Sequence, residues 1–168
     1  MRDDYGLNIW ANGDSVIEKG KICLNTPSKP ALQDMVEKIR EDGIRGPILL
    51  RFPHLIAKQI SELYTNFKAA MSEFDYGGNF CAVYPLKVNQ YPGFVGNLVE
   101  IGKKYGYGLE AGSKAELLLA MAYNELGSPI TVNGFKDKEL INLGFIAAEM
   151  GHNITITIEG LGELETII

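Results

Sequence analysis

The sequence has little cysteine, little histidine, no excess of basic charge and no long hydrophobic run. Its 168 residues include only two cysteines, Cys23 and Cys81, which cannot form a disulfide framework and favour a reducing, cytoplasmic compartment. Sixteen basic residues stand against 21 acidic ones, and the net charge of −5 argues against a nucleic-acid partner. No stretch of about 18 apolar residues is present, so we expect no membrane partner. No cluster of cysteine and histidine has metal-ligand spacing, so the pattern predicts no metal site.

Apolar segments with strand character alternate with amphipathic segments from residue 31 onward. Apolar residues make up 46% of the chain, which is enough for one core. The periodicity predicts strands over 47–52, 79–88, 107–110, 129–132 and 153–158, and helices over 31–41, 54–74, 93–105, 113–125, 137–150 and 161–168. Five consecutive strand–helix pairs of this kind indicate an α/β fold with parallel strands and right-handed crossovers.

Residues 5–24 have antiparallel β character instead. We expect Ile9-Trp10 and Val16-Ile17 to be strands that flank the turn Asn12-Gly13-Asp14, with a second turn at Lys19-Gly20-Lys21 before Ile22-Cys23-Leu24. Composition therefore predicts a β ribbon over residues 1–30 and an α/β domain over 31–168. The chain ends inside the apolar helical segment 164–168, and a complete α/β barrel needs about 250 residues. We expect a piece of a longer protein that holds about the first half of such a barrel.

Lys87 is the first candidate for chemistry. It lies near the carboxyl end of the predicted strand 79–88, where α/β folds carry their ligands. Alternation along that strand puts Cys81, Val83, Pro85, Lys87 and Asn89 on one face. A partly desolvated amine at this position is a usable nucleophile. From periodicity alone, the more common alternative is a lysine whose head group reaches solvent where the strand ends.

Three further features follow later strands. Glu110 ends the next predicted strand, so parallel pairing would bring it close to Lys87, although a strand-end carboxylate is often only structural. Ser113 opens the capping box Ser-Lys-Ala-Glu, and the first-turn amides of that helix are able to bind phosphate, as in any capped helix. Asn133-Gly134 ends the strand over 129–132 and predicts a tight turn with positive φ.

Three motifs together resemble the biosynthetic arginine decarboxylase family. They are Tyr84-Pro-Leu-Lys-Val-Asn-Gln90, Gly108-Leu-Glu-Ala-Gly-Ser-Lys114 and Asn133-Gly-Phe-Lys-Asp137. Leu49-Leu-Arg-Phe-Pro53 and the opening Tyr5-Gly-Leu-Asn-Ile-Trp10 also fit, so the resemblance runs in order over almost the whole chain. It implies the N-terminal part of a (β/α)8, TIM-like barrel, preceded by a short antiparallel β ribbon that is part of a β domain, as in alanine racemase and ornithine decarboxylase.

The resemblance also implies the chemistry. Lys87 matches the lysine that binds pyridoxal 5′-phosphate, Glu110 matches an acidic residue beside it, and Ser113 follows in the same cofactor-binding segment. The implied reaction is the decarboxylation of L-arginine to agmatine and carbon dioxide, for polyamine and spermidine biosynthesis. The family is expected to use Mg²⁺ as well and to form homo-oligomers. The sequence has no glycine-rich phosphate loop, so we expect the chain by itself to be inactive.

Two alternatives stay open at this point. The chain could be a non-catalytic, decarboxylase-like homologue that binds a partner subunit, although the retained Lys87 favours chemistry. It could also be a small doubly wound ligand-binding domain, which its apolar C-terminal segment argues against. Within the enzyme class, the alternative substrates are ornithine, lysine and diaminopimelate.

Overall fold

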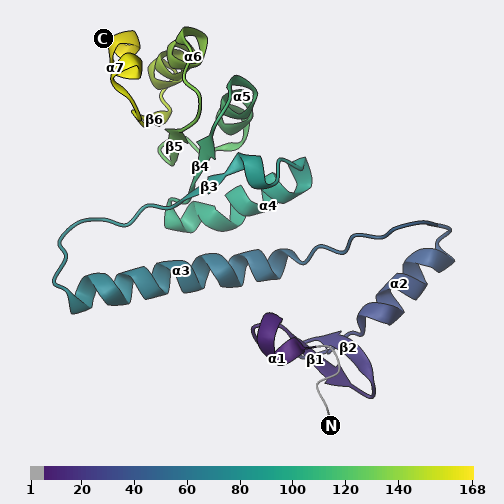
Figure 1. Ribbon diagram of the computed structural model, residues 1–168. Coiled ribbons are helices and arrows are strands. Elements are labelled where there is room, and N and C mark those ends of the chain that lie inside the picture. Colours follow the sequence, from purple (N-terminus) through teal and green to yellow (C-terminus); the bar gives the residue numbers. More distant parts are fainter. Residues whose placement is uncertain (1–5) are drawn as a thin grey trace. The chain divides into compact units, whose positions relative to one another are not determined.

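The computed structural model describes residues 6–168 of the chain (Figure 1). The contacts divide it into two units, one ending at Arg51 and the other spanning Phe52–Ile168, and each is described by itself. The parts of the predicted ribbon and of the motif from Tyr5 that fall on residues 1–5 lie outside the described residues. The domain boundary predicted between residues 30 and 31 stays a prediction.

The first unit contains a short antiparallel hairpin and two helices. Its elements are α1 (Leu7–Trp10), β1 (Ser15–Glu18), β2 (Lys21–Leu24) and α2 (Leu32–Glu41). β1 and β2 pair around the turn Lys19-Gly20, where both residues have positive φ, as a tight hairpin turn requires. The predicted antiparallel ribbon is therefore present around the second of the two predicted turns.

The predicted strand at Ile9-Trp10 is wrong, because these residues form the end of α1. The amide of Ala11 donates to the carbonyl of Leu7 at 3.0 Å, which closes a helical turn. Asn12 and Gly13 have φ values of 45° and 75°. Left-handed residues directly after a helix end it, so this Asn-Gly pair ends α1 and does not join two strands.

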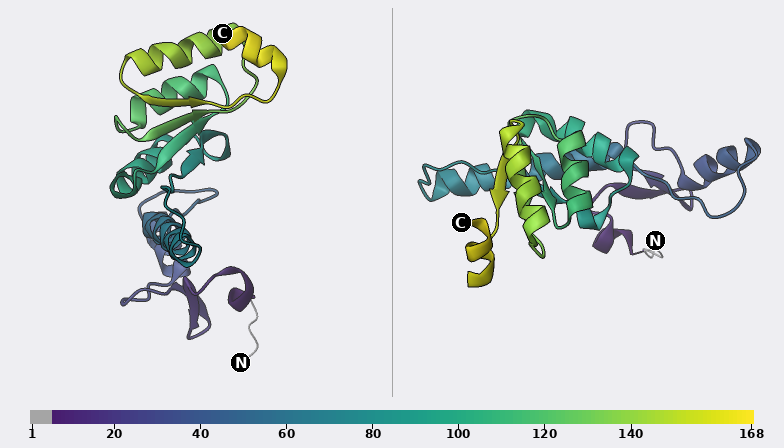
Figure 2. Two further views of the ribbon diagram at one scale, coloured as in Figure 1. Left: turned by 90° about the vertical axis from the view of Figure 1, so that its left-hand side faces the viewer. Right: turned by 90° about the horizontal axis from the view of Figure 1, so that it is seen from above.

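The second unit alternates helices with parallel strands, as the sequence predicts. Along the chain lie α3 (Pro53–Glu73), β3 (Val83–Pro85), the 3₁₀ helix η1 (Leu86–Val88), α4 (Pro92–Gly102), η2 (Lys103–Tyr105), β4 (Gly108–Ala111), α5 (Lys114–Tyr123), β5 (Pro129–Val132), α6 (Lys138–Glu149), β6 (Asn153–Ile156) and α7 (Leu161–Ile167). The four strands pair in the order β3-β4-β5-β6, all parallel, and Figure 2 shows them as one sheet. The α/β class is confirmed.

Two of the predicted strands differ from the structure. Residues 47–52 have no regular structure, and no strand of the described residues pairs with them. The Leu49 side chain within them is 70% exposed, so the middle of the segment is not buried as a sheet strand would be. The predicted strand 79–88 is reduced to β3, because Pro85 has no amide hydrogen for a ladder and a 3₁₀ turn follows it at once. The five predicted strand–helix pairs are therefore four among the described residues.

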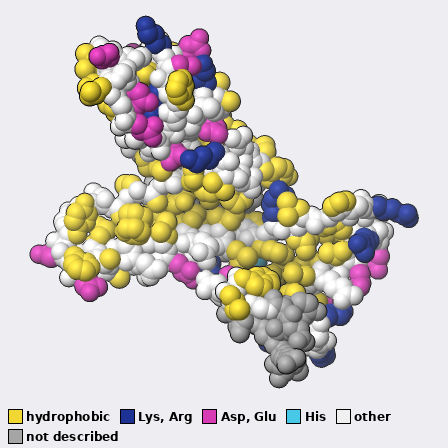
Figure 3. All heavy atoms as spheres, in the orientation of Figure 1, with side chains coloured by type: hydrophobic (Ala, Val, Ile, Leu, Met, Phe, Trp, Pro, Cys, Tyr) yellow, Lys and Arg dark blue, Asp and Glu magenta, His cyan; other side chains and the backbone are white. Residues whose placement is uncertain are grey.

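One face of the sheet carries the core. Leu109 and Ala111 on β4, and Ile130 and Val132 on β5, are fully buried in a cluster with side chains of α4, α5 and α6. Because side chains alternate along a strand, Glu110 and Thr131 lie on the opposite face. α3 adds apolar surface, seen in yellow in Figure 3, and bounds an apolar groove of about 450 Å³ with α4 and β3.

A search of the described residues for membrane-spanning segments finds no helix with the length and apolarity that a bilayer crossing requires.

Leu109→Ala tests whether the face of β4 opposite Glu110 forms the core. Leu109 is fully buried, so we expect its truncation to lower the free energy of unfolding by about 2–5 kcal/mol. Leu126→Ala is the matched control, because Leu126 is 69% exposed and should change stability by less than about 0.5 kcal/mol. Urea denaturation followed by circular dichroism measures both, and equal effects would contradict the assigned core.

Candidate functional site

The carboxyl ends of β3 to β6 meet at one edge of the sheet, as parallel pairing demands. We call this the carboxyl edge, and it comprises η1 with residues 89–91, and the segments 112–114, 133–138 and 157–161, which follow β3, β4, β5 and β6. The three residues that the sequence singles out, Lys87, Glu110 and Ser113, all lie on these segments or within two residues of them. α/β folds use this edge to bind ligands.

Lys87 and Glu110 are brought together here. Pro85 on β3 is in register with Glu110 on β4, and Lys87 follows two residues later in η1. Its Nζ lies 3.6 Å from Oε1 of Glu110. The Lys87 side chain is 66% exposed, whereas that of Glu110 is 17% exposed. The predicted proximity is confirmed, and it combines an accessible amine with a largely sheltered carboxylate.

The sequence predicts that alternate side chains from Cys81 to Asn89 share one face of a strand. This prediction is wrong beyond Pro85. Strand alternation ends where η1 begins, because a 3₁₀ helix turns side chains by about 120° per residue and not by 180°. Lys87 therefore reaches Glu110 from a helical turn next to the strand. The contact still forms because the register of β3 with β4 sets where η1 starts.

Ser113 caps α5. Its Oγ accepts a hydrogen bond from the amide of Glu116 at 3.3 Å, which is the first half of the predicted capping box. The second half differs slightly, because Oε2 of Glu116 accepts from the amide of Gly112 at 2.6 Å, one residue before the cap. The Ser113 hydroxyl uses its oxygen in this cap and keeps its proton available for donation.

Gln90 and Lys136 also take part in this edge, and sequence reasoning did not single them out. Gln90 Nε2 donates to Oε1 of Glu116 at 2.7 Å. The Lys136 side chain is fully buried, and its Nζ lies 2.5 Å from the carbonyl of Gly134 and 3.2 Å from Oε1 of Glu163. The available sequence signal for Glu116 was its place in the capping box. Gln90 and Lys136 lie within motifs that carry the resemblance, but no local pattern indicates their contacts, because Glu116 and Glu163 are 26 and 27 residues away.

Glycines 112 and 134 let the loops after β4 and β5 touch. A Cβ on Gly134 would lie 2.2 Å from the carbonyl oxygen of Gly112, closer than any real Cβ contact. Gly134 has no positive φ, so the predicted tight turn with positive φ is wrong. Glycine is needed here because two backbones approach each other closely.

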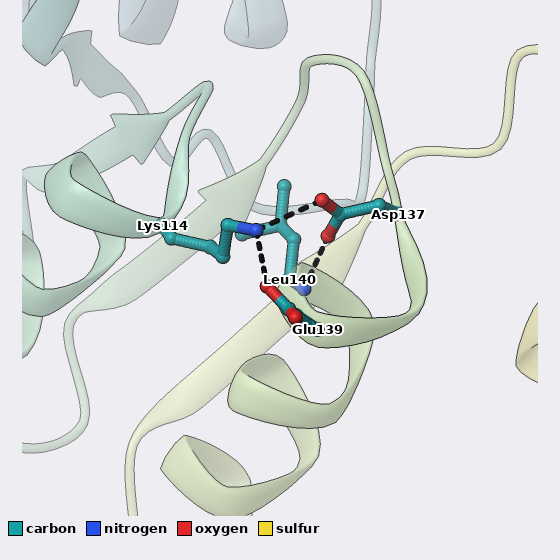
Figure 4. A network of polar contacts seen from close by, with 4 residues as sticks. All are labelled: Lys114, Asp137, Glu139 and Leu140. Atoms are coloured by element: carbon teal, nitrogen blue, oxygen red, sulfur yellow. Dashed lines mark hydrogen bonds and ion pairs between the residues drawn. The ribbon is translucent and has the colours of Figure 1, made fainter.

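Lys114 joins the starts of two neighbouring helices (Figure 4). Its Nζ donates to Oδ2 of Asp137 at 2.9 Å and to Oε2 of Glu139 at 2.5 Å, while Asp137 also accepts the amide of Leu140 as the N-cap of α6. The hydrogen bonds to Glu139 and Asp137 raise the pKa of Lys114. The hydrogen bond from Lys114, followed by that from the Leu140 amide, lowers the pKa of Asp137.

Glu163 has a related position at the start of α7. Its Oε2 accepts the amide of Glu159 at 2.8 Å, and this bond, ahead of the ion pair with Lys136, lowers the pKa of Glu163. Both cysteines are free thiols, and Cys23 is buried whereas Cys81 is exposed. Within residues 6–168, no three histidine, cysteine, aspartate or glutamate residues could together hold a metal ion.

Comparison with known proteins gives one consistent relationship. No family model matches the chain. The biosynthetic arginine decarboxylases of Xanthomonas axonopodis pv. citri and Tolumonas auensis are 37% and 38% identical to it, over 99% and 96% of its length. The crystal structure of the biosynthetic arginine decarboxylase from Campylobacter jejuni is 70% identical over 98% of the chain, with a TM-score of 0.93.

A diaminopimelate decarboxylase from M. jannaschi covers 93% of the chain with a TM-score of 0.64 and 23% identity, which shows a shared fold. The chain spans about a quarter of the length of the curated relatives it matches, 27% and 26% for the two above, and 28% of the Campylobacter jejuni chain.

Acid should weaken the carboxyl edge through Asp137. Since its pKa is lower in the folded state than in the unfolded chain, its contribution to stability is complete above the unfolded pKa, near 4, and is lost as pH falls through the folded pKa. Asp137→Asn keeps a capping oxygen and removes the charge. We expect its free energy of unfolding to be lower than that of the unchanged chain at pH 7 and to fall less steeply below about pH 5.

Asp42→Asn is the control for this comparison, because Asp42 lies at the exposed end of α2 in the other unit. Urea denaturation at a series of pH values measures all three proteins. If Asp137→Asn keeps the full acid dependence of the unchanged chain, the ion pair with Lys114 does not stabilise this edge.

Proposed function

We propose that this chain, which is similar to about one quarter of biosynthetic arginine decarboxylase, supplies the cofactor lysine, Lys87, to an enzyme that converts L-arginine to agmatine and carbon dioxide. The observation that carries the proposal is the contact of the Lys87 amine with the Glu110 carboxylate at the carboxyl edge. The similarity of the whole chain to arginine decarboxylases supports arginine as the substrate over ornithine, lysine or diaminopimelate, since the diaminopimelate decarboxylase shares the fold at only 23% identity. Agmatine would then enter polyamine synthesis.

The residues at the carboxyl edge fit pyridoxal 5′-phosphate. Lys87 offers an exposed primary amine, which the cofactor aldehyde requires for covalent attachment. Glu110 sits beside it with a sheltered carboxylate that orients the amine and balances positive charge. Ser113 keeps a hydroxyl proton to donate to an anionic group of the cofactor. When bound, the cofactor supplies an electron sink for the pair released as the α-carboxylate leaves.

Magnesium is different. Within residues 6–168, no three histidine, cysteine, aspartate or glutamate side chains converge, so the described residues do not fit a magnesium site, and we derive no step through that ion.

We further propose that the four parallel strands are an arc of a (β/α)8 barrel. Support comes from their sequential order and from the polar side chains on the face opposite the core. Within the described chain, β3 and β6 each pair along one edge only, so further strands could continue the sheet on both sides. The hairpin β1–β2 would then be part of the β domain, and the whole enzyme a cytoplasmic homo-oligomer.

Covalent labelling tests the cofactor role of Lys87. The 168-residue chain is incubated with pyridoxal 5′-phosphate, reduced with borohydride and analysed by peptide mass spectrometry. We expect Lys87 to carry most of the adduct, because its exposed amine faces the largely sheltered Glu110 carboxylate on the same edge as the Ser113 hydroxyl, which would hold an anionic group of the cofactor. Lys87→Ala should remove this adduct, whereas Lys138→Ala, the control at another exposed lysine of the carboxyl edge, should leave it unchanged. Labelling spread evenly over surface lysines would contradict the proposal.

An activity assay tests whether the 168-residue chain alone can decarboxylate L-arginine. We expect the purified chain with pyridoxal 5′-phosphate and L-arginine to form no agmatine above background, because the chain spans only about a quarter of the length of its curated relatives. Liquid chromatography with mass detection measures agmatine, and a full-length arginine decarboxylase serves as the positive control. Agmatine production that disappears in Lys87→Ala would show that this quarter alone is an enzyme and would overturn the expectation.

A further inference from the structure

Three of the four loops of the carboxyl edge are each tied by a side chain to the helix start that follows the next strand. The segment after β3 reaches α5, the start of α5 reaches α6, and the segment after β5 reaches α7. The three links are Gln90 to Glu116, Lys114 to Asp137 and Glu139, and Lys136 to Glu163. They form an unbroken series that runs along the edge from the Lys87 segment to the start of α7.

Glu116 makes the link nearest to the proposed cofactor lysine, and it uses both of its oxygens. Oε2 accepts from the amide of Gly112 at 2.6 Å, which fixes the segment that follows Glu110. Oε1 accepts from Nε2 of Gln90 at 2.7 Å, which fixes the segment that follows Lys87. Glu163 repeats this arrangement in α7, with one oxygen on the amide of its own loop and the other on Lys136.

The direct contact between Lys87 and Glu110 does not fix their relative position by itself. At 3.6 Å it is longer than a hydrogen bond, and the Lys87 side chain is 66% exposed. An ion pair of a long, exposed side chain adds little free energy and allows many rotamers. The backbone of η1 is held against β4 by the register of β3 with β4 and by the buried side chain of Leu86. Glu116 adds a link between the segment after η1 and the segment after β4, because its partner Gln90 is three residues from Lys87 and its partner Gly112 is two residues from Glu110.

We propose that Glu116 is a positioning residue, which holds the segment after β3 against the segment after β4 and so presents the Lys87 amine beside Glu110. This inference rests on the proposed role of Lys87 as the cofactor lysine. Glu116 touches neither Lys87 nor the cofactor in this role. It acts through Gln90 on one side and through Gly112 on the other.

The chemistry of the link offers a conservative variant. In Glu116→Gln, the amide oxygen still accepts from Gly112, and the amide nitrogen donates to the Gln90 oxygen once the Gln90 amide turns over. Glu116→Ala removes both bonds, and Gln90→Ala removes only one. The set therefore separates the link itself from the charge of Glu116.

The first measurement is the fraction of all pyridoxal adducts that Lys87 carries after borohydride reduction of the 168-residue chain. We expect Glu116→Ala and Gln90→Ala each to lower this fraction about threefold to fivefold, the scale of one exposed, charge-assisted hydrogen bond. The double variant should be no worse than Glu116→Ala, since the two residues act through one link. Glu116→Gln should match the unchanged chain. Glu149→Ala is the matched control, because Glu149 is an exposed glutamate at the end of α6 that is farther from the carboxyl edge.

The second measurement is amide hydrogen exchange without any cofactor. Glu116→Ala should speed exchange at Gly112 and in residues 86–91, whereas Gln90→Ala should speed it in residues 86–91 and spare Gly112. If Glu116→Ala exposes Gly112 but leaves residues 86–91 and the Lys87 fraction unchanged, the inference is overturned. A loss of Lys87 selectivity in Glu116→Gln would also overturn it, because the charge and not the link would then matter.

The two measurements separate failure of this inference from failure of the proposed function. If the unchanged chain shows no preference for Lys87, the cofactor role fails, and the exchange of residues 86–91 still decides whether Glu116 holds that segment. If Lys87 is preferred equally in the unchanged chain and in Glu116→Ala, the cofactor role stands and the positioning role fails.

Discussion

Parallel pairing of β4 with β3 and with β5 is the constraint on which the candidate site depends. The register sets Pro85 opposite Glu110 and Glu110 opposite Thr131, so the start of η1 and the loop after β4 have fixed places along one edge. Alternation then puts Glu110 on the face away from the buried Leu109 and Ala111. A shift of one residue would exchange these faces, burying the carboxylate among apolar helices. The same burial that stabilises the sheet therefore selects the side chain that faces Lys87.

Backbone proximity and side-chain links then hold the loops together. The carbonyl of Gly112 approaches Gly134 so closely that no Cβ fits between them. The links from Gln90 and Lys114 are hydrogen bonds at the surface, where each one contributes modestly. The link from Lys136 starts from a buried amine, which lies 3.2 Å from the Glu163 carboxylate. The three links matter more as a series than singly, because the loops after β3, β4 and β5 are each tied to the helix start that follows the next strand. Ordering one loop then lowers the entropic cost of ordering its neighbour.

Much of the fold and part of the site could be predicted from the sequence. Helix caps at Ser113 and Asp137 and the apolar strands β4 and β5 are local signals, so their elements were predicted within a few residues. The contact of Lys87 with Glu110 followed from the order of parallel strands. Three features depend on contacts with residues distant in the sequence. They are the turn at Asn12-Gly13, the absence of a strand over 47–52 and the early end of β3. Gln90 and Lys136 could not be predicted, since their partners are distant in sequence and their residue types are common on surfaces.

Zero-length cross-linking tests the central claim, that parallel pairing brings the Lys87 amine to the Glu110 carboxylate. A carbodiimide joins amines to carboxylates only where they are in contact, so the 168-residue chain should yield a peptide in which Lys87 is bonded to Glu110. The exposed pair Lys103 and Glu125, with 3.0 Å between nitrogen and oxygen, serves as an internal positive control. If the control pair is joined while Lys87 is found unmodified or bonded to another carboxylate, the account of this edge is wrong.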